Sequence, residues 1–529
     1  MTQHFQVVVV GSGFAGSLIA MIAHRLGLST ALVERGRHPR FVIGESTTPL
    51  TNLLLEDLAN DYDLPFVLPL CKWGTWQEKA PHLACGLKRG FTFYHHELDQ
   101  PFRPDPDRQR QLLVGASPRE AIADTHWYRP DFDHYLVQQA QALGVTYWDE
   151  VELTSAREEA DGMHLTGNRG GDAIDLKADF VIDATGPRGF LHRALGLPDK
   201  QFATLPPTQA LFSHFADVGP LPDSFQAGVG TPPYPPEQAA VHHVFAGGWV
   251  WVLKFNNGLT SAGIAATDPL ANALDLPSGA PAWRKLLQRL PSLAEIFGPA
   301  RAVVPFIHQP RLAFQSGVVA GRNWALLPSA AGVVDPLLST GFPLTLLGVG
   351  RIARLLQSHW QLPSFQPGLL DYAQLTAREL ETTARLVGAL YATMDRFERF
   401  KELSLLYFAA ASFSETARRL GKSHLADAFL LCRNPVFSPQ IEQICALAGK
   451  PLSAREARNL RRSIRKAIEP FDVTGLDDDT RHPWYPAIPA DLLRNAPKLG
   501  VGAIEMATLF KKCGLTAEIM TSASCGKIS

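Results

Sequence analysis

The sequence is poor in features that mark secreted, metal-binding or nucleic-acid-binding proteins. Its six cysteines lie far apart, without CxxC spacing and without a histidine cluster beside them, at Cys71, Cys85, Cys432, Cys445, Cys513 and Cys525. Such spacing argues against a zinc site or a disulfide framework and is typical of a reducing cytoplasm. The formal net charge of the 529 residues is −1, which leaves no basic excess for a polyanionic partner. We therefore expect a cytoplasmic protein that binds no metal and no nucleic acid.

Long uninterrupted hydrophobic runs are also missing. The stretch 332–350 is interrupted by Asp335, Pro336 and Pro343, and the stretch 403–413 is short. Both are interpreted as core segments and not as membrane spans. The start of the chain has neither the basic residues nor the small-residue cleavage site of a signal peptide. Hydrophobic residues make up 46% of the chain, enough for a large core in two or three lobes with no membrane partner.

A glycine-rich turn near the start of the chain separates a strand from a helix. Residues 6–10 are apolar and mostly β-branched, residues 11–16 read GSGFAG, and residues 17–26 have helical periodicity. Glycines in such a turn let the backbone approach a pyrophosphate at the helix N-terminus. A second strand, 29–34, ends at an acidic residue that can accept hydrogen bonds from a ribose hydroxyl. The residues predicted to contact the cofactor are Gly11, Gly13, Ala15, Gly16 and Glu34.

Two later segments favour FAD over NAD as the cofactor. Residues 183–186 (DATG) resemble the second glycine turn of two-lobed flavoproteins. Residues 330–336 (AAGVVDP) resemble their flavin-ring segment, which places Asp335 and, shortly after it, Phe342 beside the cofactor. Residues 327–328 are Leu-Pro where such proteins usually carry Gly-Asp.

The order of these segments predicts an α/β protein with a two-lobed FAD-binding fold, Rossmann-like and of the aromatic-hydroxylase type. The FAD-binding lobe is expected to be discontinuous, over 1–200 and 300–360. Residues 201–299, where β patterns alternate with Pro and Gly turns, are expected to insert an antiparallel sheet that belongs to a substrate lobe. Residues 361–529 are expected to be mostly helical and carry no motif that we can interpret.

Four further segments match motifs of one enzyme family. They are residues 41–49 (FVIGESTTP), 84–93 (ACGLKRGFTF), 249–253 (WVWVL) and 335–341 (DPLLSTG). The family versions are the GE(S/A)xxP loop near the flavin, the strand with an essential lysine, the start of a WxWxIP motif and the halide-binding DPLxSxG loop. Over roughly its first 360 residues the chain therefore resembles the flavin-dependent halogenases, most of all their phenol-type (pyoluteorin-pathway-like) branch.

The resemblance implies a chemistry and a set of residues for it. In this family reduced FAD and oxygen convert halide into hypohalous acid. A lysine, here Lys88, holds the oxidised halogen by a hydrogen bond or as a haloamine and passes it to an electron-rich ring. A separate NAD(P)H-dependent flavin reductase supplies the reduced FAD. The other residues implied are Glu45 beside the flavin, Thr340 and Gly341 for the chloride or bromide ion, and Trp249 and Trp251 along the substrate channel.

Lys88 also suits such a role on local grounds. On a continuous strand Lys88 and Gly90 share one face and Phe91 lies on the other, so the small neighbour leaves room around the amine. A constricted and partly dry channel would lower the pKa of this amine. The alternative is a strand lysine that extends to solvent. Two rival lysines, Lys72 and Lys79, lie in polar, turn-like stretches.

Backbone N–H groups in the tight 335–341 loop are expected to form an anion pocket, with Gly341 free to take the φ that the loop needs. Alternatively, Ser339 or Thr340 simply caps the helix that follows. Three histidines are interpreted as structural or solvent-exposed: His126, His242 and His243.

The substrate is expected to be a small phenolic ring. Halogenases that act on tryptophan carry a glutamate where this chain has Leu338, which argues against free tryptophan, and a ring attached to a carrier protein stays open. The apolar stretch 403–413 is expected to cover an aromatic pocket. Leu253-Lys254 replaces the Ile-Pro of the tryptophan motif. An FAD-dependent monooxygenase, a flavin-dependent prenyl reductase and a flavoprotein without activity therefore stay open as alternatives.

Overall fold

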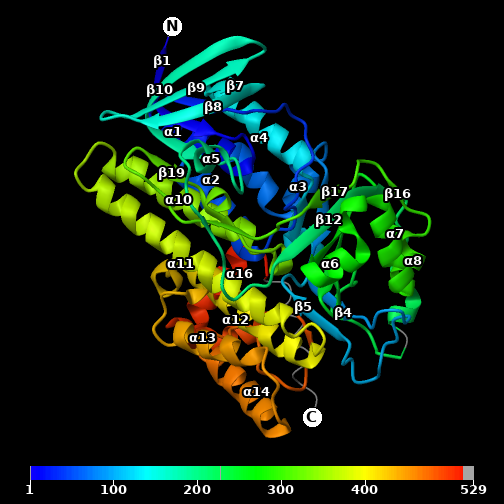
Figure 1. Cartoon of the computed structure of the whole chain (residues 1–529). Helices are drawn as coiled ribbons and strands as arrows, with labels where there is room; N and C mark the ends of the chain where they lie inside the picture. The colour runs from blue at the N-terminus through cyan, green and yellow to red at the C-terminus, as the bar shows by residue number, and fades with distance from the viewer. Residues whose placement is uncertain (1, 227, 516–529) are drawn as a thin grey trace.

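The structure, a computed structural model, describes residues 2–226 and 228–515. Figure 1 shows a lobe with β1, α1 and β8–β10 at the top, a second lobe with β12 and α6–α8 at the right, and the helices α11–α14 below them. A hydrophobic core cluster runs from Val7 in the first strand to Phe510 near the end of the described chain. The C-terminal region therefore shares the core of the nucleotide-binding lobe.

The nucleotide-binding lobe is built on a mainly parallel sheet. Its strand order is β7-β2-β1-β10-β9-β8, with β19 paired to β10. The strands are β1 (Gln3–Val10), β2 (Thr30–Val33), β7 (Thr146–Trp148), β8 (Val151–Glu158), β9 (Met163–Arg169), β10 (Asp172–Asp183) and β19 (Trp324–Leu326). Strands β7, β2, β1, β10 and β19 run parallel. The valines at the end of β1 are buried, as expected of a strand covered on both faces.

Helices on the faces of this sheet complete the lobe. Helix α1 (Phe14–Arg25) packs against β1, against α4 (Arg129–Leu143) and against α10 (Gly341–His359). Helix α10 also contacts α2 (Pro49–Asp61) and α9 (Pro328–Ala331). The loops before α1 and α10 therefore lie at the same side of the sheet, where the cofactor site is expected.

The second lobe is a mixed sheet with the order β16-β12-β15-β14-β13-β4-β5-β21 and with β17 paired to β12. The strands are β4 (Gly90–His95), β5 (Gln111–Gly115), β12 (Thr208–Ala216), β13 (Ala240–Phe245), β14 (Gly248–Lys254), β15 (Thr260–Thr267), β16 (Arg301–Ala302), β17 (Ile307–Gln309) and β21 (Trp484–Tyr485). The expected antiparallel arrangement holds for β12 to β15. Beyond residues 201–299 the sheet continues through two parallel pairs, β13–β4 and β5–β21, which bring together segments far apart in the sequence.

The outer face of this sheet is covered by three helices. They are α6 (Asp268–Leu274), α7 (Ala280–Arg289) and α8 (Pro291–Phe297). A second hydrophobic cluster joins them to the sheet through Phe215, Val250, Trp283 and Phe297.

The chain passes from one sheet to another in the middle of the predicted lysine strand. Strand β3 (Cys85–Lys88) pairs only with β6 (Asp124–Trp127) among the described strands, whereas β4 joins the mixed sheet. The continuous strand expected over residues 84–93 is therefore wrong. The break falls at Arg89, whose N–H donates to the Gln238 carbonyl outside both strands.

The C-terminal region is mostly helical, as its sequence predicts over the described residues 361–515. Its main helices are α11 (Phe365–Tyr391), α12 (Phe397–Arg419), α13 (Phe437–Ala448), α14 (Ala454–Ile468), α15 (Pro489–Asn495) and α16 (Ala503–Cys513). Helix α12 packs against both α14 and α2. The one strand in this stretch of the described chain, β21, extends the mixed sheet at β5.

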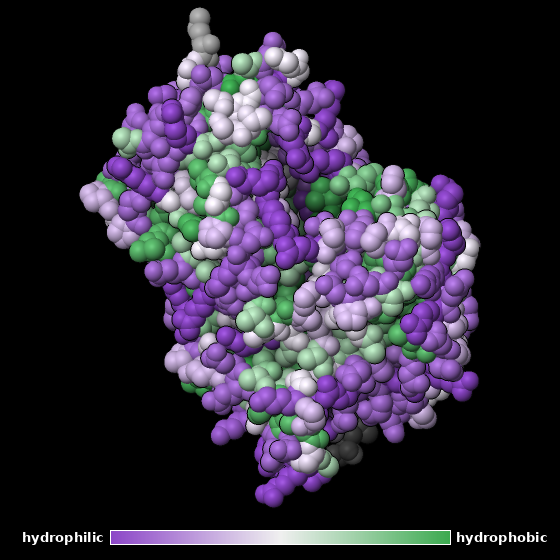
Figure 2. Space-filling model, in the orientation of Figure 1, coloured by the Kyte–Doolittle hydropathy of each residue, from purple (hydrophilic) through white to green (hydrophobic). Residues whose placement is uncertain are grey.

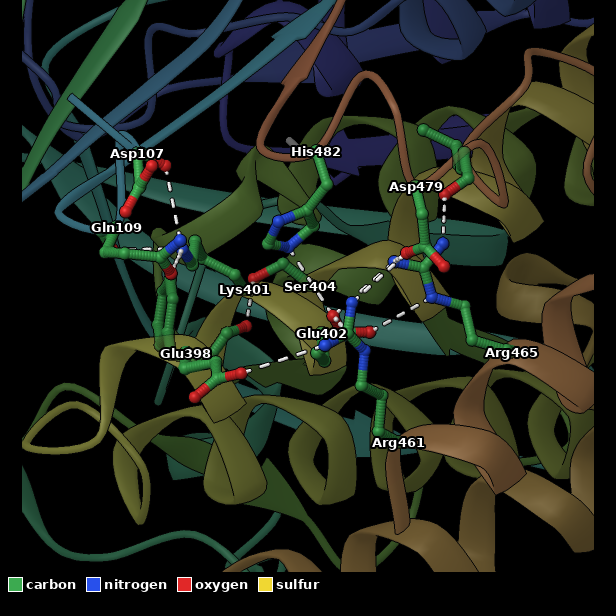
Figure 3. Close-up of polar contacts among 12 residues, drawn as sticks. Asp107, Gln109, Glu398, Lys401, Glu402, Ser404, Arg461, Arg465, Asp479 and His482 are labelled. Carbon is green, nitrogen blue, oxygen red and sulfur yellow. Dashed lines mark hydrogen bonds and ion pairs between the residues drawn. The ribbon is translucent and has the colours of Figure 1, made fainter. Parts of the chain in front are cut away.

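A partly buried network of charges fixes this region to the rest of the molecule (Figure 3). Glu402 of α12 lies 3.3 Å from the guanidinium groups of Arg461 and Arg465 on α14, and 3.5 Å from the ring of His482, just before β21. The neighbouring Lys401 Nζ donates to the Gln109 carbonyl at 3.0 Å, just before β5. The network therefore joins α12 to α14, to the segment before β21 and to the mixed sheet.

None of the helices in residues 2–226 and 228–515 is long and apolar enough to cross a membrane. In the same residues we find no group of three His, Cys, Asp or Glu side chains placed to hold a metal ion. The described cysteines are free thiols, and Cys525 lies outside the described residues.

Candidate active site

A cavity of about 540 Å³ lies between the glycine-rich turn, the 41–49 loop and the loop before α10. We call it the first cavity, and on the face shown in Figure 2 the surface is hollowed between the upper and right-hand lobes. The predicted site residues that line it are Gly11, Gly13, Ala15, Glu34, Glu45, Trp249, Trp251, Asp335, Thr340, Gly341 and Phe342. Two other predicted residues, Gly16 and Lys88, do not line the cavity and lie behind the residues that do.

The two glycine turns touch each other at one end of the first cavity. Gly11 has φ +96°, and a Cβ there would lie 2.8 Å from the Ala184 carbonyl carbon of the second turn. A Cβ at Gly16 would lie 1.8 Å from the Gly11 carbonyl oxygen. Gly11 therefore permits the contact between the turns, and Gly16 lets α1 pack closely on the turn.

Glu34 follows β2 and is buried in the same wall. Its carboxylate accepts hydrogen bonds from the N–H groups of Ser12 at 2.9 Å and Gly36 at 2.8 Å, and from the Arg40 guanidinium at 3.1 Å. Burial alone would raise the pKa of Glu34, but Arg40 and these N–H groups hold it below its usual value. Glu34 is therefore an ionised acceptor. Arg40, which also lines the cavity, was not predicted.

The 41–49 loop is held by two residues that no motif marked. His214 of β12 places Nε2 2.6 Å from Glu45 Oε1, and both side chains are buried. Arg129 donates to the Gly44 carbonyl at 2.8 Å and forms two hydrogen bonds with Asp133, at 2.8 and 2.7 Å. The Arg–Asp spacing of four residues at a helix start is the signal that could have identified Arg129.

Residues 335–341, which we call the halide loop after their predicted role, obtain their bend from residues other than Gly341. Leu338 (φ +65°) and Ser339 (φ +55°) are left-handed, whereas Gly341 is the first residue of α10. The expectation that Gly341 supplies the unusual φ is therefore wrong, because the turn is completed before the helix begins. A Cβ at Gly341 would project into open space. The free N–H groups at the start of this helix can attract an anion there.

The tryptophan motif and the halide loop meet at Tyr391 of α11. The Tyr391 hydroxyl donates to Asp335 Oδ2 at 2.8 Å and accepts from the Trp249 indole N–H at 3.1 Å. The other Asp335 oxygen accepts from the Leu337 N–H at 2.9 Å. Burial raises the pKa of Asp335 to about 7. One Asp335 oxygen is therefore engaged by its own loop and the other by α11.

Trp249 and Trp251 form one side of the first cavity, with ring centroids 5.7 Å apart. His242 stacks on Trp249 at 5.0 Å and also lines the cavity. The described histidines His126, His242 and His243 are all buried. Burial lowers the pKa of His242 and of His243 to about 3, so these two rings are neutral packing elements at physiological pH.

Lys88 ends β3 and is fully buried, with 0% of its surface exposed. Its Nζ donates to the Ser46 hydroxyl at 2.8 Å and to the Thr47 carbonyl at 2.5 Å. The same atom lies 3.5 Å from the Ser339 hydroxyl of the halide loop. Because Ser46 and Ser339 line the first cavity, the amine lies directly behind that wall and does not extend to solvent.

The neighbours of Lys88 differ from those expected on a continuous strand. Its Nζ lies 3.8 Å from the centre of the Phe91 ring, because the break at Arg89 turns Phe91 toward the amine. Burial lowers the pKa of Lys88 to about 7, although the carboxylate of Asp124 acts in the opposite direction. The amine can therefore be neutral at physiological pH.

A second cavity, of about 180 Å³, begins at the other neighbours of Lys88. Phe91 and Asp124 line it. Most of its apolar wall comes from the C-terminal third, from Tyr407, Phe408, Ala411, Ile488, Leu509 and Phe510. Lys88 thus lies in the partition between the two cavities. Of the rival lysines, Lys72 lines the second cavity, and Lys79 is exposed and paired with Glu78 at 2.7 Å.

The residues around the first cavity fit FAD. The two glycine turns, the N-terminus of α1 and the Glu34 carboxylate line it, as the binding of a nucleotide and its pyrophosphate requires. The apolar side chains of Phe342 and Trp251 and the halide loop also line it, as the binding of a flat ring system requires.

Comparison with known proteins gives consistent matches. The FAD dependent oxidoreductase family matches residues 6–314. The chain is 28% identical over 403 residues to monodechloroaminopyrrolnitrin halogenase PrnC of Pseudomonas fluorescens, covering 75% of this chain and 69% of that protein. It is 27% identical over 510 residues to tetracycline 7-halogenase of Kitasatospora aureofaciens, covering 90% of each. A crystal structure of halogenase PltM in complex with phloroglucinol and FAD has a TM-score of 0.78 at 23% identity, covering 91% of this chain and 99% of that one.

The chain belongs to the FAD dependent oxidoreductase family, and the α/β fold expected from its sequence is confirmed. Within this family it groups with the flavin-dependent halogenases, which confirms the resemblance drawn from its four motifs. FAD is accordingly its cofactor.

Proposed function

We propose that this chain chlorinates or brominates a small phenolic ring, and that Lys88 passes the oxidised halogen from the first cavity to the second. The observation that carries the proposal is the position of one buried amine in the partition between the two cavities. A surface lysine could not serve, because hypohalous acid would escape into water before it met the ring.

The first cavity would hold reduced FAD and a halide ion. Bound reduced FAD with oxygen supplies the oxidising power that turns halide into hypohalous acid. The residues proposed for the cofactor are those of the two glycine turns, Glu34, Glu45, Asp335 and Phe342. Thr340 and Gly341, at the N-terminus of α10, would hold the halide through backbone N–H groups. Trp249 and Trp251 would keep the aromatic substrate away from the flavin.

Lys88 would receive the oxidised halogen on its uncharged amine. Burial lowers the pKa of this amine to about 7, so a large fraction is neutral near pH 7 and can act as a nucleophile toward halogen. Ser339 of the halide loop places its hydroxyl 3.5 Å from the amine. An ammonium group in the same place could only hold hypohalous acid by a hydrogen bond.

The second cavity suits one aromatic ring. Its volume of about 180 Å³ compares with cavities of about 150 Å³ that take up benzene in other proteins. Leu338 is the residue at the position where tryptophan halogenases carry a glutamate. A phenol activates its own ring through the oxygen lone pair and needs no such carboxylate. The related halogenase PltM has been crystallised with phloroglucinol, a phenol.

The proposal is tested with purified protein, FAD, a separate NAD(P)H-dependent flavin reductase, oxygen and either chloride or bromide. Phloroglucinol, other phenols and free tryptophan are offered, and products are identified by mass spectrometry. The wild type is expected to give halogenated phenols and to leave tryptophan unchanged. Products that contain an added oxygen and form without halide would indicate a monooxygenase.

Two variants, Lys88→Ala and Lys88→Arg, distinguish halogen transfer by the lysine from oxidation of reduced FAD. Both are expected to lower halogenation by about a hundredfold or more, the scale for removing a group that acts on reacting atoms, while reduced FAD is still oxidised. Arginine keeps a cation but stays protonated and cannot accept halogen. Lys79→Ala, at an exposed lysine, is the matched control and should leave product formation unchanged. Normal halogenation by Lys88→Ala would contradict the proposal.

A further inference from the structure

We infer that Asp124 is a second catalytic residue, which gives Lys88 a proton as the halogen leaves and takes up the proton that the aromatic ring loses. The inference rests on the proposed function of Lys88. It assigns a role to a buried acid that none of the sequence motifs includes.

Asp124 and Lys88 are direct partners in the β3–β6 ladder. Residues in direct register across two strands project their side chains to the same face. Asp124 also lines the second cavity beside Phe91, whose ring lies against the Lys88 amine. The carboxyl group therefore lies on the same face of the ladder as the amine and borders the space that the ring would occupy. It has no hydrogen bond or ion pair with Lys88 Nζ, so a proton would pass between the two groups through one bridging water.

A second residue holds this carboxyl group in place. The Asn52 side-chain amide of α2 donates to Asp124 Oδ1 at 2.9 Å and to the Thr47 hydroxyl at 3.2 Å. The carbonyl of Thr47 in turn accepts from Lys88 Nζ. Asn52 thereby connects the acid to the segment that positions the amine.

Asp124 is better suited than its neighbours to give and take up a proton near neutral pH. Burial raises the pKa of Asp124 to about 7, with the Lys88 amine opposing that change, so the acid retains a proton near neutrality. Burial lowers the pKa of His126 well below its usual value and that of His242 to about 3. The remaining titratable and charged groups that face Asp124 lie on α12: Tyr407, Glu415 and Arg419. Glu415 is bound to Arg419 at 2.6 Å.

The neutral Lys88 amine and hypohalous acid form an N–halogen bond and release water, the amine proton leaving with the hydroxide. A ring carbon then attacks the halogen, the N–halogen bond breaks, and its electron pair stays on nitrogen and takes the proton of the Asp124 carboxyl. The Asp124 carboxylate finally removes the proton from the halogenated ring carbon. Ring C–H and hypohalous acid have become ring C–halogen and water, and both side chains are restored.

The first experiment uses Asp124→Asn, which keeps the size of the side chain and cannot transfer a proton. Halogenation of phloroglucinol should fall by about a hundredfold, within the range for losing a general acid–base, while reduced FAD is oxidised at the wild-type rate. The ring-deuterium isotope effect should rise clearly above unity, because loss of the ring proton becomes slow. Glu379→Gln, at another fully buried acid that pairs with Arg351, should leave the isotope effect unchanged.

The second experiment compares pH profiles of halogenation per flavin oxidised. Activity requires one proton on the Lys88–Asp124 pair, so the wild type should give a bell-shaped profile. Asp124→Asn should lose the alkaline limb. Asn52→Ala, which removes a hydrogen bond that lowers the pKa of Asp124, should move that limb to higher pH.

These outcomes separate the inference from the proposed function. If Asp124→Asn halogenates with wild-type rate, isotope effect and pH profile while Lys88→Ala does not, Asp124 is not the proton carrier and the lysine relay stands. If the wild type gives no halogenated product, the proposed function fails first. If Asp124→Asn does not fold, an unmoved profile in Asn52→Ala overturns the inference.

Discussion

At the scale of single residues, one hydroxyl determines how two motifs meet. Tyr391 of α11 accepts from the Trp249 indole and donates to Asp335 in the halide loop. All three side chains are buried, although Trp249 and Asp335 also line the first cavity. A buried polar group without a partner costs about 1–3 kcal/mol.

Tyr391→Phe should therefore lower the free energy of unfolding by about 1–3 kcal/mol, since it leaves both the Trp249 N–H and an Asp335 oxygen without a partner. Denaturant unfolding of the cofactor-free protein measures the change. Tyr135→Phe is a suitable control, because the Tyr135 hydroxyl bonds to the Phe66 carbonyl in a half-buried place that water can reach, and its loss should be smaller. Equal losses of stability in the two variants would show that the Tyr391 hydrogen bonds to Trp249 and Asp335 stabilise the protein no more than a half-buried hydrogen bond does.

The same scale shows how much of the site is predictable from sequence. Glycine turns and the halide loop are local patterns, and the structure brings their residues, except Gly16, together around one cavity. Their partners were not predicted, because pairs such as Glu45 with His214 are 169 residues apart. Nothing local distinguishes a histidine that will meet a buried carboxylate. Lys88 was assigned from a motif, but its contact with Phe91 depends on a strand break that the alternating pattern did not reveal.

At the scale of elements, helix α12 forms a wall of the second cavity. Tyr407, Phe408 and Ala411 line that cavity, while Glu402 on the same helix is bound to α14. The sequence predicted a helix here and a cover for an aromatic pocket. It could not indicate which apolar residues would face the cavity, because cavity-lining and core positions have the same helical spacing.

Ala411→Phe should partly fill the second cavity. We expect KM for phloroglucinol to rise about tenfold, since overpacking an apolar site typically costs 1–3 kcal/mol. Oxidation of reduced FAD should be unaffected, because Ala411 is not part of the first cavity. Steady-state kinetics with a flavin-oxidation assay in parallel tests this. An unchanged KM would mean that the ring binds elsewhere.

At the scale of the whole molecule, the C-terminal region completes a site that begins near the N-terminus. Parallel pairing of β21 with β5 and the Glu402 network (Figure 3) fix the segment that supplies Ile488 to the second cavity. Sequence alone suggested a separate helical region, because no motif after residue 361 points back to the sheet.

Glu402→Ala should destabilise the protein by about 1–3 kcal/mol, the scale of losing hydrogen bonds to charged groups, because Glu402 is buried but its partners Arg461 and Arg465 reach water. Hydrogen exchange should increase in residues 472–492, and KM for the phenol should rise more than the Kd for FAD. Glu398→Gln, at an exposed residue 3.9 Å from Arg461, should change stability by less than about 1 kcal/mol. A uniform rise in hydrogen exchange across the molecule would show that the network stabilises the whole fold and not residues 472–492 in particular.

The unequal origin of the two cavities has an evolutionary consequence. The chamber assigned to oxidant production is built almost entirely from residues up to Thr345, with Leu380 added, whereas the chamber assigned to the ring takes most of its wall from residues 407–515. Under the proposed function, mutations in the second set would admit new aromatic compounds without disturbing the chamber proposed to generate hypohalous acid. The architecture would then allow a lineage to diversify its products by drift in its C-terminal helices, with the Lys88 amine kept constant.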